Sequence, residues 1–262
     1  MNFEEKQIEN IMKLYNKNPE LRVLCASAFS SFLNKRNIQP GAIKIGSIDE
    51  QKRNLLLSVI DPAWWNINQK RQFKYDAQKN TENISLINLN IPLNKELNKE
   101  LNKEQPVNYQ ISYKTDLAIK HKYQLSHYFL FLEKFAKEIG NGELSCVTIT
   151  KLKPHSDVSW HFDPGLYYML RDRYHIVLKS EGSSQCFEND EYFFQERDIW
   201  WFNTKVEHAA RNDSNEDRIH IIFDVLPFKN KRIQDILIKM SYNDDIDSSA
   251  LSEEYRILNN IL

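Results

Sequence analysis

The part of the chain after residue 142 is a series of short segments rich in β-branched and aromatic residues, separated by turn-forming residues. Seven such segments follow one another, at 146–154, 157–163, 173–180, 184–189, 191–195, 198–204 and 218–227. Many short strands joined by tight turns are typical of all-β domains. We therefore predict an antiparallel barrel or sandwich, such as a jelly roll, with a mainly β fold overall.

Apolar residues at helical spacing flank this β region. They predict helices over 3–35, over 116–139 and beyond Pro227, while 54–60 and 83–90 are interpreted as strands. We expect three parts: a helical region with supporting strands at 1–110, the β core with its leading helix at 111–228, and a helical tail at 229–262.

Residues 92–106 repeat the unit Leu-Asn-Lys-Glu three times. A period of four keeps the leucines near one helix face, which would suit a docking helix. Slippage of a repeat within a surface loop produces the same pattern. We favour the loop insertion and give the segment no role in chemistry.

Charge and cysteine content narrow the class of protein. The 35 basic and 36 acidic residues give a net charge of -1, so nothing indicates nucleic acid or acidic lipid as a partner. The three cysteines are far apart and lack zinc-binding spacing, which indicates reduced thiols in a cytoplasmic protein. We expect neither a secretory signal nor a membrane span.

One strand carries a histidine and an aspartate two residues apart, His161 and Asp163. Residues two apart point to the same face of a strand, so this pair can bind one metal ion. His155 and Asp157 repeat the spacing, but they follow Lys153-Pro154 and read as the turn before the strand. We therefore prefer His161 and Asp163.

A second histidine and an arginine flank the turn-rich segment 212–217. If this segment closes a regular hairpin, His208 and Arg218 face each other across two paired strands, about 5 Å apart at Cβ. A metal ligand and a guanidinium would then share one cavity wall. That arrangement suits a co-substrate that chelates the metal at one end and presents a carboxylate to Arg218 at the other.

His161, Asp163 and His208 together make a 2-His-1-carboxylate set, which suits non-haem Fe(II) and leaves three coordination positions open. Two positions would take 2-oxoglutarate and one would take O2. We therefore expect an oxygenase in which these three residues bind iron and Arg218 anchors 2-oxoglutarate.

The stretch from Leu152 to Val225 also resembles the aspartyl/asparaginyl β-hydroxylase family of 2-oxoglutarate oxygenases. The motifs that carry this resemblance are HFDPG, RYH at 173–175, DIWWFNT, the His208 region and RIHIIFD. The resemblance implies a double-stranded β-helix, a cupin-like jelly roll. It also implies that Arg173 and His175 line the 2-oxoglutarate pocket.

The carboxylate at Asp163 bears on the branch of the family. Vertebrate-type aspartyl hydroxylases lack this ligand, so the chain looks more like the proline-hydroxylase branch, and halogenase chemistry is disfavoured. The implied substrate is an Asp-, Asn- or Pro-type amino acid, free or within a peptide.

Two other interpretations of the same residues stay open. Arg173 and His175 could be a structural arginine and a core histidine, and His220 could be either a cavity residue or a packed barrel histidine. A cupin-like metal-binding module without activity, serving as a sensor or scaffold, could contain the same ligands, because fold alone does not fix function.

Overall fold

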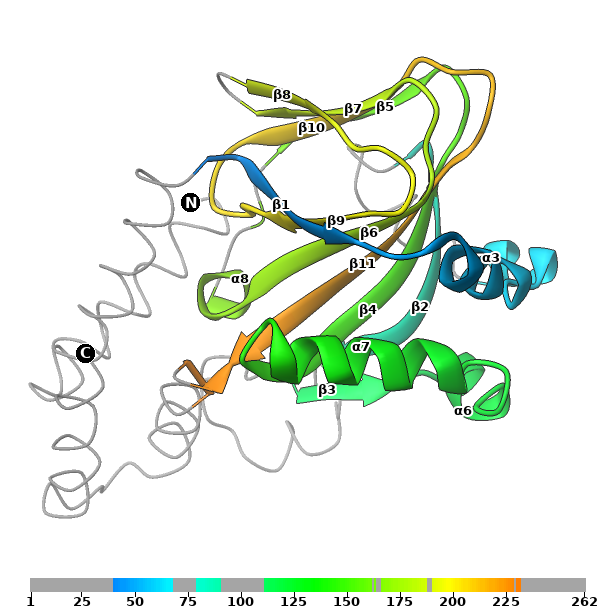
Figure 1. Ribbon diagram of the computed structural model, residues 1–262, viewed down its shortest axis with the longest axis vertical. Helices are drawn as coiled ribbons and strands as arrows, with labels where there is room; N and C mark the ends of the chain where they lie inside the picture. Colours follow the sequence, from blue (N-terminus) through cyan, green and yellow to red (C-terminus); the bar gives the residue numbers. More distant parts are fainter. Residues whose placement is uncertain are drawn as a thin grey trace, which may run out of the picture.

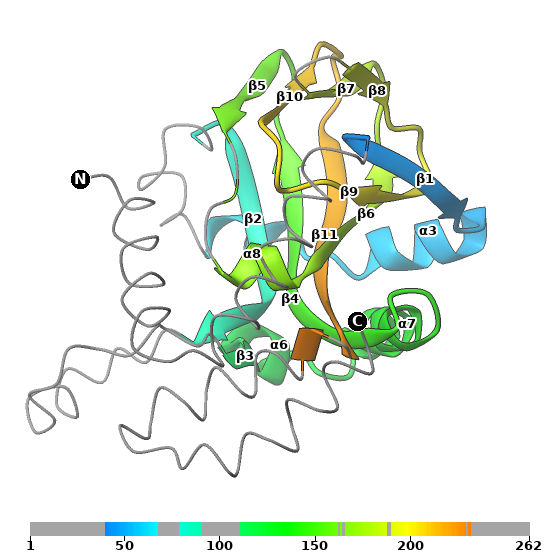
Figure 2. The ribbon, with the colours of Figure 1, turned by 90° about the vertical axis from the view of Figure 1, so that its left-hand side faces the viewer.

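The computed structural model describes residues 40–67, 79–90, 111–161, 163, 166–187, 190–228 and 230–231. Two antiparallel sheets lie one above the other (Figures 1 and 2). The larger has the order β1 (Ala42–Ser47), β9 (Asp198–Phe202), β6 (Asp172–Lys179), β11 (Arg218–Pro227), β4 (Gly142–Leu152), β2 (Thr81–Asn90) and β3 (Ile111–Lys114). The smaller has the order β5 (Ser156–His161), β10 (His208–Asn212), β7 (Ser183–Phe187) and β8 (Asp190–Phe193).

From β4 onward the chain passes back and forth between the two sheets. Strands β4, β6, β9 and β11 lie in the larger sheet and β5, β7, β8 and β10 in the smaller. Only β7 and β8 are consecutive strands that pair with each other as a hairpin within this part. This alternation defines a jelly roll, so the predicted double-stranded β-helix core is confirmed. The seven predicted segments each overlap one of its strands, and β10 is the eighth.

The outer face of the larger sheet packs against helix α7 (Ser126–Glu138) (Figure 1). Leu132 and Phe135 of the helix join Ile221 and Phe223 of β11 in the main apolar core. Burying such a side chain stabilises the fold by about 1.5–3 kcal/mol. Because side chains alternate along a strand, the residues between them on β11 point to the inner face, toward the smaller sheet.

The remaining helices are short: α3 (Glu50–Ser58), the 3-10 helix η1 (Pro62–Asn66), α6 (Asp116–Lys120) and α8 (Leu166–Leu170). Residues 54–60, predicted as a strand, instead belong largely to α3, so that prediction was wrong. Asp49 caps this helix by accepting a hydrogen bond from the Lys52 amide. A short apolar run does not show whether its apolar residues repeat with the period of a helix or of a strand. Here the N-cap at Asp49 favours the helix.

Strand β2 contains the predicted strand 83–90, and it lies in the larger sheet together with β1. Both come from the predicted first part of the chain, 1–110, yet pair with strands of the predicted core. The repeat at 92–106, the helix at 3–35 and nearly all of the tail lie outside the described residues. Within the described residues, no helix has the length and apolar character needed to span a membrane.

Candidate metal centre and anchor site

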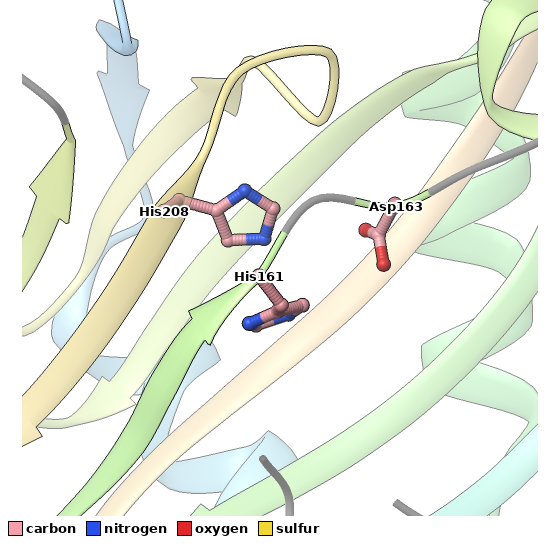
Figure 3. A group of neighbouring side chains, drawn as sticks. All are labelled: His161, Asp163 and His208. Atoms are coloured by element: carbon pink, nitrogen blue, oxygen red, sulfur yellow. The ribbon is translucent and has the colours of Figure 1, made fainter. Parts of the chain in front are cut away.

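The structure brings His161, Asp163 and His208 together, as their spacing predicts (Figure 3). His161 is the last residue of β5, Asp163 follows two residues later, and His208 begins β10 directly opposite His161. One ligand atom from each residue lies within 4.8 Å of the others. His208 is buried, while His161 and Asp163 are half-buried, so the cluster lies at the edge of the interior.

Backbone carbonyls orient both histidines. Nδ1 of His161 lies 2.7 Å from the carbonyl of Ser159, and Nδ1 of His208 lies 2.9 Å from that of Val206. Each Nδ1–H therefore donates to the backbone, which leaves the Nε2 lone pair free for a metal ion. Burial lowers the pKa of His208 to about 4, so its imidazole is neutral near pH 7, as a metal ligand must be.

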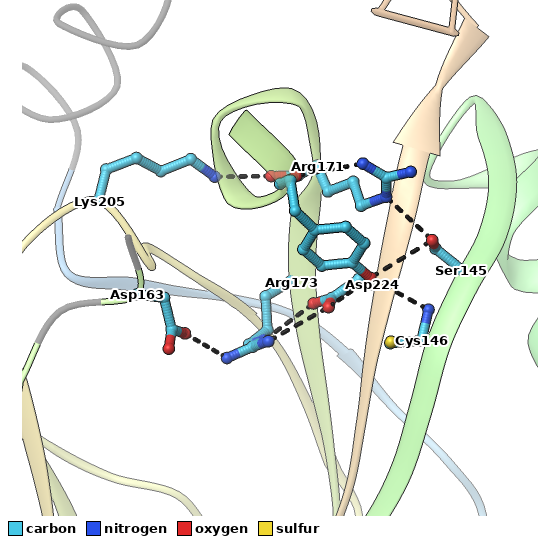
Figure 4. Close-up of polar contacts among 8 residues, drawn as sticks. Ser145, Cys146, Asp163, Arg171, Arg173, Lys205 and Asp224 are labelled. Carbon is cyan, nitrogen blue, oxygen red and sulfur yellow. Dashed lines mark hydrogen bonds and ion pairs between the residues drawn. The ribbon is translucent and has the colours of Figure 1, made fainter. Parts of the chain in front are cut away.

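The carboxylate of Asp163 forms an ion pair with Arg173 (Figure 4). Nη1 of Arg173 lies 2.5 Å from Oδ2 of Asp163, and Nε of the same guanidinium lies 2.8 Å from Oδ1 of Asp224. Arg173 thus bridges the candidate ligand and a carboxylate that is 2% exposed. Its predicted role at the 2-oxoglutarate pocket is untested, whereas its contact with Asp163 was not predicted.

A buried polar network extends this bridge away from the cluster (Figure 4). The Tyr167 hydroxyl donates to Asp224 at 2.9 Å, and Nε of Arg171 donates to the Ser145 hydroxyl at 2.9 Å. The buried ammonium of Lys205 donates to the Arg171 carbonyl at 2.6 Å. These bonds fasten α8 and the residue after it to β11, to β4 and to the loop after β9.

Arg218 does not face His208 across a hairpin, so that prediction was wrong. Strand β10 pairs with β5 and β7, whereas β11 pairs with β4 and β6, so the two residues come from opposite sheets. The turn between them crosses from one sheet to the other, and turn composition alone does not distinguish this from a hairpin. The ligand and the arginine line one interior from two sides instead of sharing one wall.

Arg218 is a buried cation, 3% exposed, at the inner face of β11. Among the described residues no carboxylate lies within ion-pair distance of its guanidinium, which contacts Nδ1 of His220 at 3.1 Å. Burial lowers the pKa of Arg218 to about 9. A buried guanidinium without a counter-charge is costly to maintain, and a ligand carboxylate would offset that cost.

A chain of side-chain contacts connects Arg218 to the metal cluster. Nδ1 of His175 lies 3.3 Å from Nδ1 of His220, and the His175 ring stacks on Phe202 with centroids 4.6 Å apart. Phe202 in turn meets the His208 ring edge-to-face at 4.8 Å. His175 therefore lies between the two predicted sites. His220 lies two residues after Arg218 on β11, and this alternation is the sequence signal that points to it.

The alternative pair takes no part in this cluster. His155 has a positive φ of 50° in the turn before β5, and its ring contacts the Asn215 side chain at 2.9 Å. Both His155 and Asp157 are exposed. The choice of His161 and Asp163 over this pair agrees with the only potential metal cluster found among the described residues.

Residues 108–227, a little under half of the chain, match the family model described as aspartyl/asparaginyl beta-hydroxylase. The resemblance predicted from the motifs is thereby confirmed for this region. All six predicted site residues fall within it, and the match supports an enzyme of the hydroxylase class. None of the curated proteins compared matches the chain.

Several solved structures have similar folds. An oxidoreductase of the 2OG-Fe(II) oxygenase family from Burkholderia pseudomallei is 7% identical with a TM-score of 0.44, over 76% of this chain and 90% of its own. A predicted oxalate decarboxylase from Thermotoga maritima is 18% identical with a TM-score of 0.27, over 32% of this chain and 67% of its own. A cupin domain from Bordetella pertussis is 14% identical with a TM-score of 0.27, over 32% and 82%. Similarities of this size say nothing of activity.

Proposed function

We propose that the protein is an Fe(II)- and 2-oxoglutarate-dependent oxygenase that hydroxylates an amino acid, free or within a peptide. The observation that carries this proposal is that one interior contains both a 2-His-1-carboxylate cluster and the buried Arg218. Among the described residues, no carboxylate forms an ion pair with this arginine. Such a cluster suits non-haem Fe(II) and leaves positions open for other ligands. A fixed guanidinium deeper in the interior suits the far carboxylate of one of those ligands.

The donor set fits iron in its details. His161 and His208 would bind the metal through Nε2, because their Nδ1–H groups donate to backbone carbonyls. Asp163 would bind through the oxygen that Arg173 does not hold. When bound, Fe(II) and 2-oxoglutarate supply the oxidising chemistry, in which O2 converts the co-substrate to succinate and CO2 and a substrate C–H is hydroxylated.

The chain's own residues bind the co-substrate, orient the metal ligands and exclude water. Arg218 anchors the co-substrate, and Arg173 fixes the direction of the Asp163 carboxylate. Phe202, whose ring contacts those of His175 and His208, contributes an apolar side chain to the interior that the metal cluster and Arg218 share. A dry interior strengthens each of these electrostatic contacts.

The substrate class rests on the family match. It favours an Asp- or Asn-type residue, either as a free amino acid or in a peptide, and the carboxylate at Asp163 adds a Pro-type residue as in the branch that the motifs resemble. A turnover screen against free amino acids and short peptides, with mass-spectrometric detection of one added oxygen, would identify it.

We also propose a cytoplasmic location. Neither Cys146 nor Cys186 takes part in a disulfide, as is usual for proteins of reducing compartments.

An anaerobic titration tests the proposed function. Fe(II) and 2-oxoglutarate added without O2 should give the visible charge-transfer band of a metal-bound 2-oxo acid. Asp163→Ala should abolish the band, whereas His155→Ala, which alters the exposed alternative histidine, should leave it unchanged. Absence of the band in well-folded wild-type protein would contradict the proposal. A band without succinate formation under air, even with substrate present, would instead favour the non-catalytic metal-binding module.

A further inference from the structure

A histidine outside the predicted site lies beside the anchor arginine. His220 is fully buried on β11, two residues after Arg218 and therefore on the same inner face. Its Nδ1 lies 3.1 Å from Nη2 of Arg218. Within the described part of the chain, His220 is the hydrogen-bond partner of this guanidinium, which has no other.

This contact fixes where the protons are on two histidines. A guanidinium can only donate, so Nδ1 of His220 must be unprotonated and its proton lies on Nε2. The same Nδ1 lies 3.3 Å from Nδ1 of His175, which must then be the donor. Burial lowers the pKa of both histidines well below the usual value, so both are neutral near pH 7. Arg218 and His175 thus share one acceptor on His220.

Packing holds the His220 ring in this orientation. The ring is parallel to Phe194 at 6.1 Å, and it meets His175 edge-to-face at 5.6 Å. Thr150 is its partner on the neighbouring strand β4. Its Nε2 is buried and finds no partner among the described residues. A buried donor without an acceptor costs about 1–3 kcal/mol, which a ligand oxygen in the same interior would offset.

We propose that His220 is a positioning residue for the 2-oxo dicarboxylate, in addition to the predicted anchor. By accepting from Arg218 it fixes the plane of the guanidinium toward the far carboxylate, and its buried Nε2–H remains a donor for a ligand oxygen in the same interior. This inference rests on the proposed function. It makes His220 a determinant of selectivity for a 2-oxo acid that ends in a carboxylate.

The test compares two ligands in the full-length protein with Fe(II) under anaerobic conditions. One is 2-oxoglutarate, and the other is 2-oxopentanoate, which has the same chain length but a methyl group in place of the far carboxylate. His220→Leu should weaken 2-oxoglutarate binding roughly tenfold to one-hundredfold and leave 2-oxopentanoate binding within about twofold of wild type. The ratio of the two dissociation constants reports positioning, since general loss of structure would weaken both ligands together.

Conservative variants and a matched control sharpen the result. His220→Asn places an oxygen near the Nδ1 position and should recover part of the ratio, whereas His220→Gln leaves Arg218 without that acceptor and should recover less. Thr150→Val, at the neighbouring position on β4, should keep the wild-type ratio.

Two outcomes overturn the inference. A wild-type ratio in His220→Leu is one, whether or not both affinities have changed. If His220→Leu does not fold, equal ratios in the Asn and Gln variants are the other. Absence of any 2-oxoglutarate band in the wild type would contradict the proposed function itself, and is recognised before any variant is compared.

Discussion

Arg173 joins two carboxylates of unlike position, with Asp163 at the edge of the interior and Asp224 at its base, through contacts of 2.5 and 2.8 Å. The guanidinium therefore links Asp163, a candidate metal ligand, to the buried Asp224 on β11 and so fixes the orientation of the Asp163 carboxylate. Removal of one member of a buried charge network leaves its partners uncompensated.

Arg173→Leu should lower the free energy of unfolding by about 3–5 kcal/mol, because Asp224 would remain buried without its cation. The affinity for Fe(II) should fall about 10- to 100-fold, because Asp163 loses the group that orients it. Urea unfolding and anaerobic Fe(II) titration measure the two effects. Lys179→Ala, which removes an exposed ion pair with Glu216, is the control and should cost less than about 1 kcal/mol. Unchanged iron affinity in Arg173→Leu would refute the positioning role.

Asn212, the last residue of β10, connects the end of β4 to the turn before β11. Its buried amide nitrogen donates to the carbonyls of Leu152, Lys153 and Glu216, at 3.1, 3.0 and 2.8 Å. Asn212→Ala should therefore destabilise the fold by about 2 kcal/mol, which denaturant unfolding would measure. Asn215→Ala, at an exposed position on the same turn, should change stability by less than about 0.5 kcal/mol. Equal effects of the two variants would contradict this account of Asn212.

The buried histidines predict a loss of stability at mildly acidic pH. Burial lowers the pKa of His220 and of His175 well below 6.5, so the folded protein stays unprotonated where the unfolded chain binds protons. The free energy of unfolding must then decrease as pH falls through about 6.5, by about 1.4 kcal/mol per histidine between pH 7.5 and 5.5. Urea unfolding at both pH values, with a chelator present, measures this change.

His220→Asn removes one of these groups and should reduce that pH-dependent change by about 1.4 kcal/mol. His155→Asn, at an exposed histidine, is the matched control and should leave the change as it is in wild type. An unaltered pH dependence in His220→Asn would show that His220 is protonated in the folded protein as readily as in the unfolded chain.

The strands and the proximity of His161 to Asp163 were predictable from local pattern. Alternation along 157–163 predicted that His161 and Asp163 lie together, and they do, although β5 ends at His161 and Asp163 follows the strand. The turn residues of Lys153-Pro154 set the alternative pair apart. Both depend on residues close in sequence, which is where periodicity and turn chemistry are informative.

What the sequence could not supply depends on contacts distant along the chain. The segment 213–217 crosses between sheets instead of closing a hairpin, because β10 and β11 each find partners elsewhere. Likewise, the bridge from Arg173 to Asp163 and Asp224 joins three separate segments. The helix over Glu50–Ser58 shows that local pattern can also mislead at short range. A short apolar run fits the period of a strand and of a helix equally well, until the residue that caps the helix is recognised.

Oxygen-isotope tracing tests the central claim most directly. Wild-type protein with Fe(II), 2-oxoglutarate and its amino-acid or peptide substrate under ¹⁸O2 should form succinate that contains one ¹⁸O atom, with a second ¹⁸O atom in the hydroxylated product. Asp163→Ala should form neither. Succinate without ¹⁸O, or labelled succinate at equal rates in Asp163→Ala, would contradict the assignment of His161, Asp163 and His208 as the iron site of a 2-oxoglutarate oxygenase.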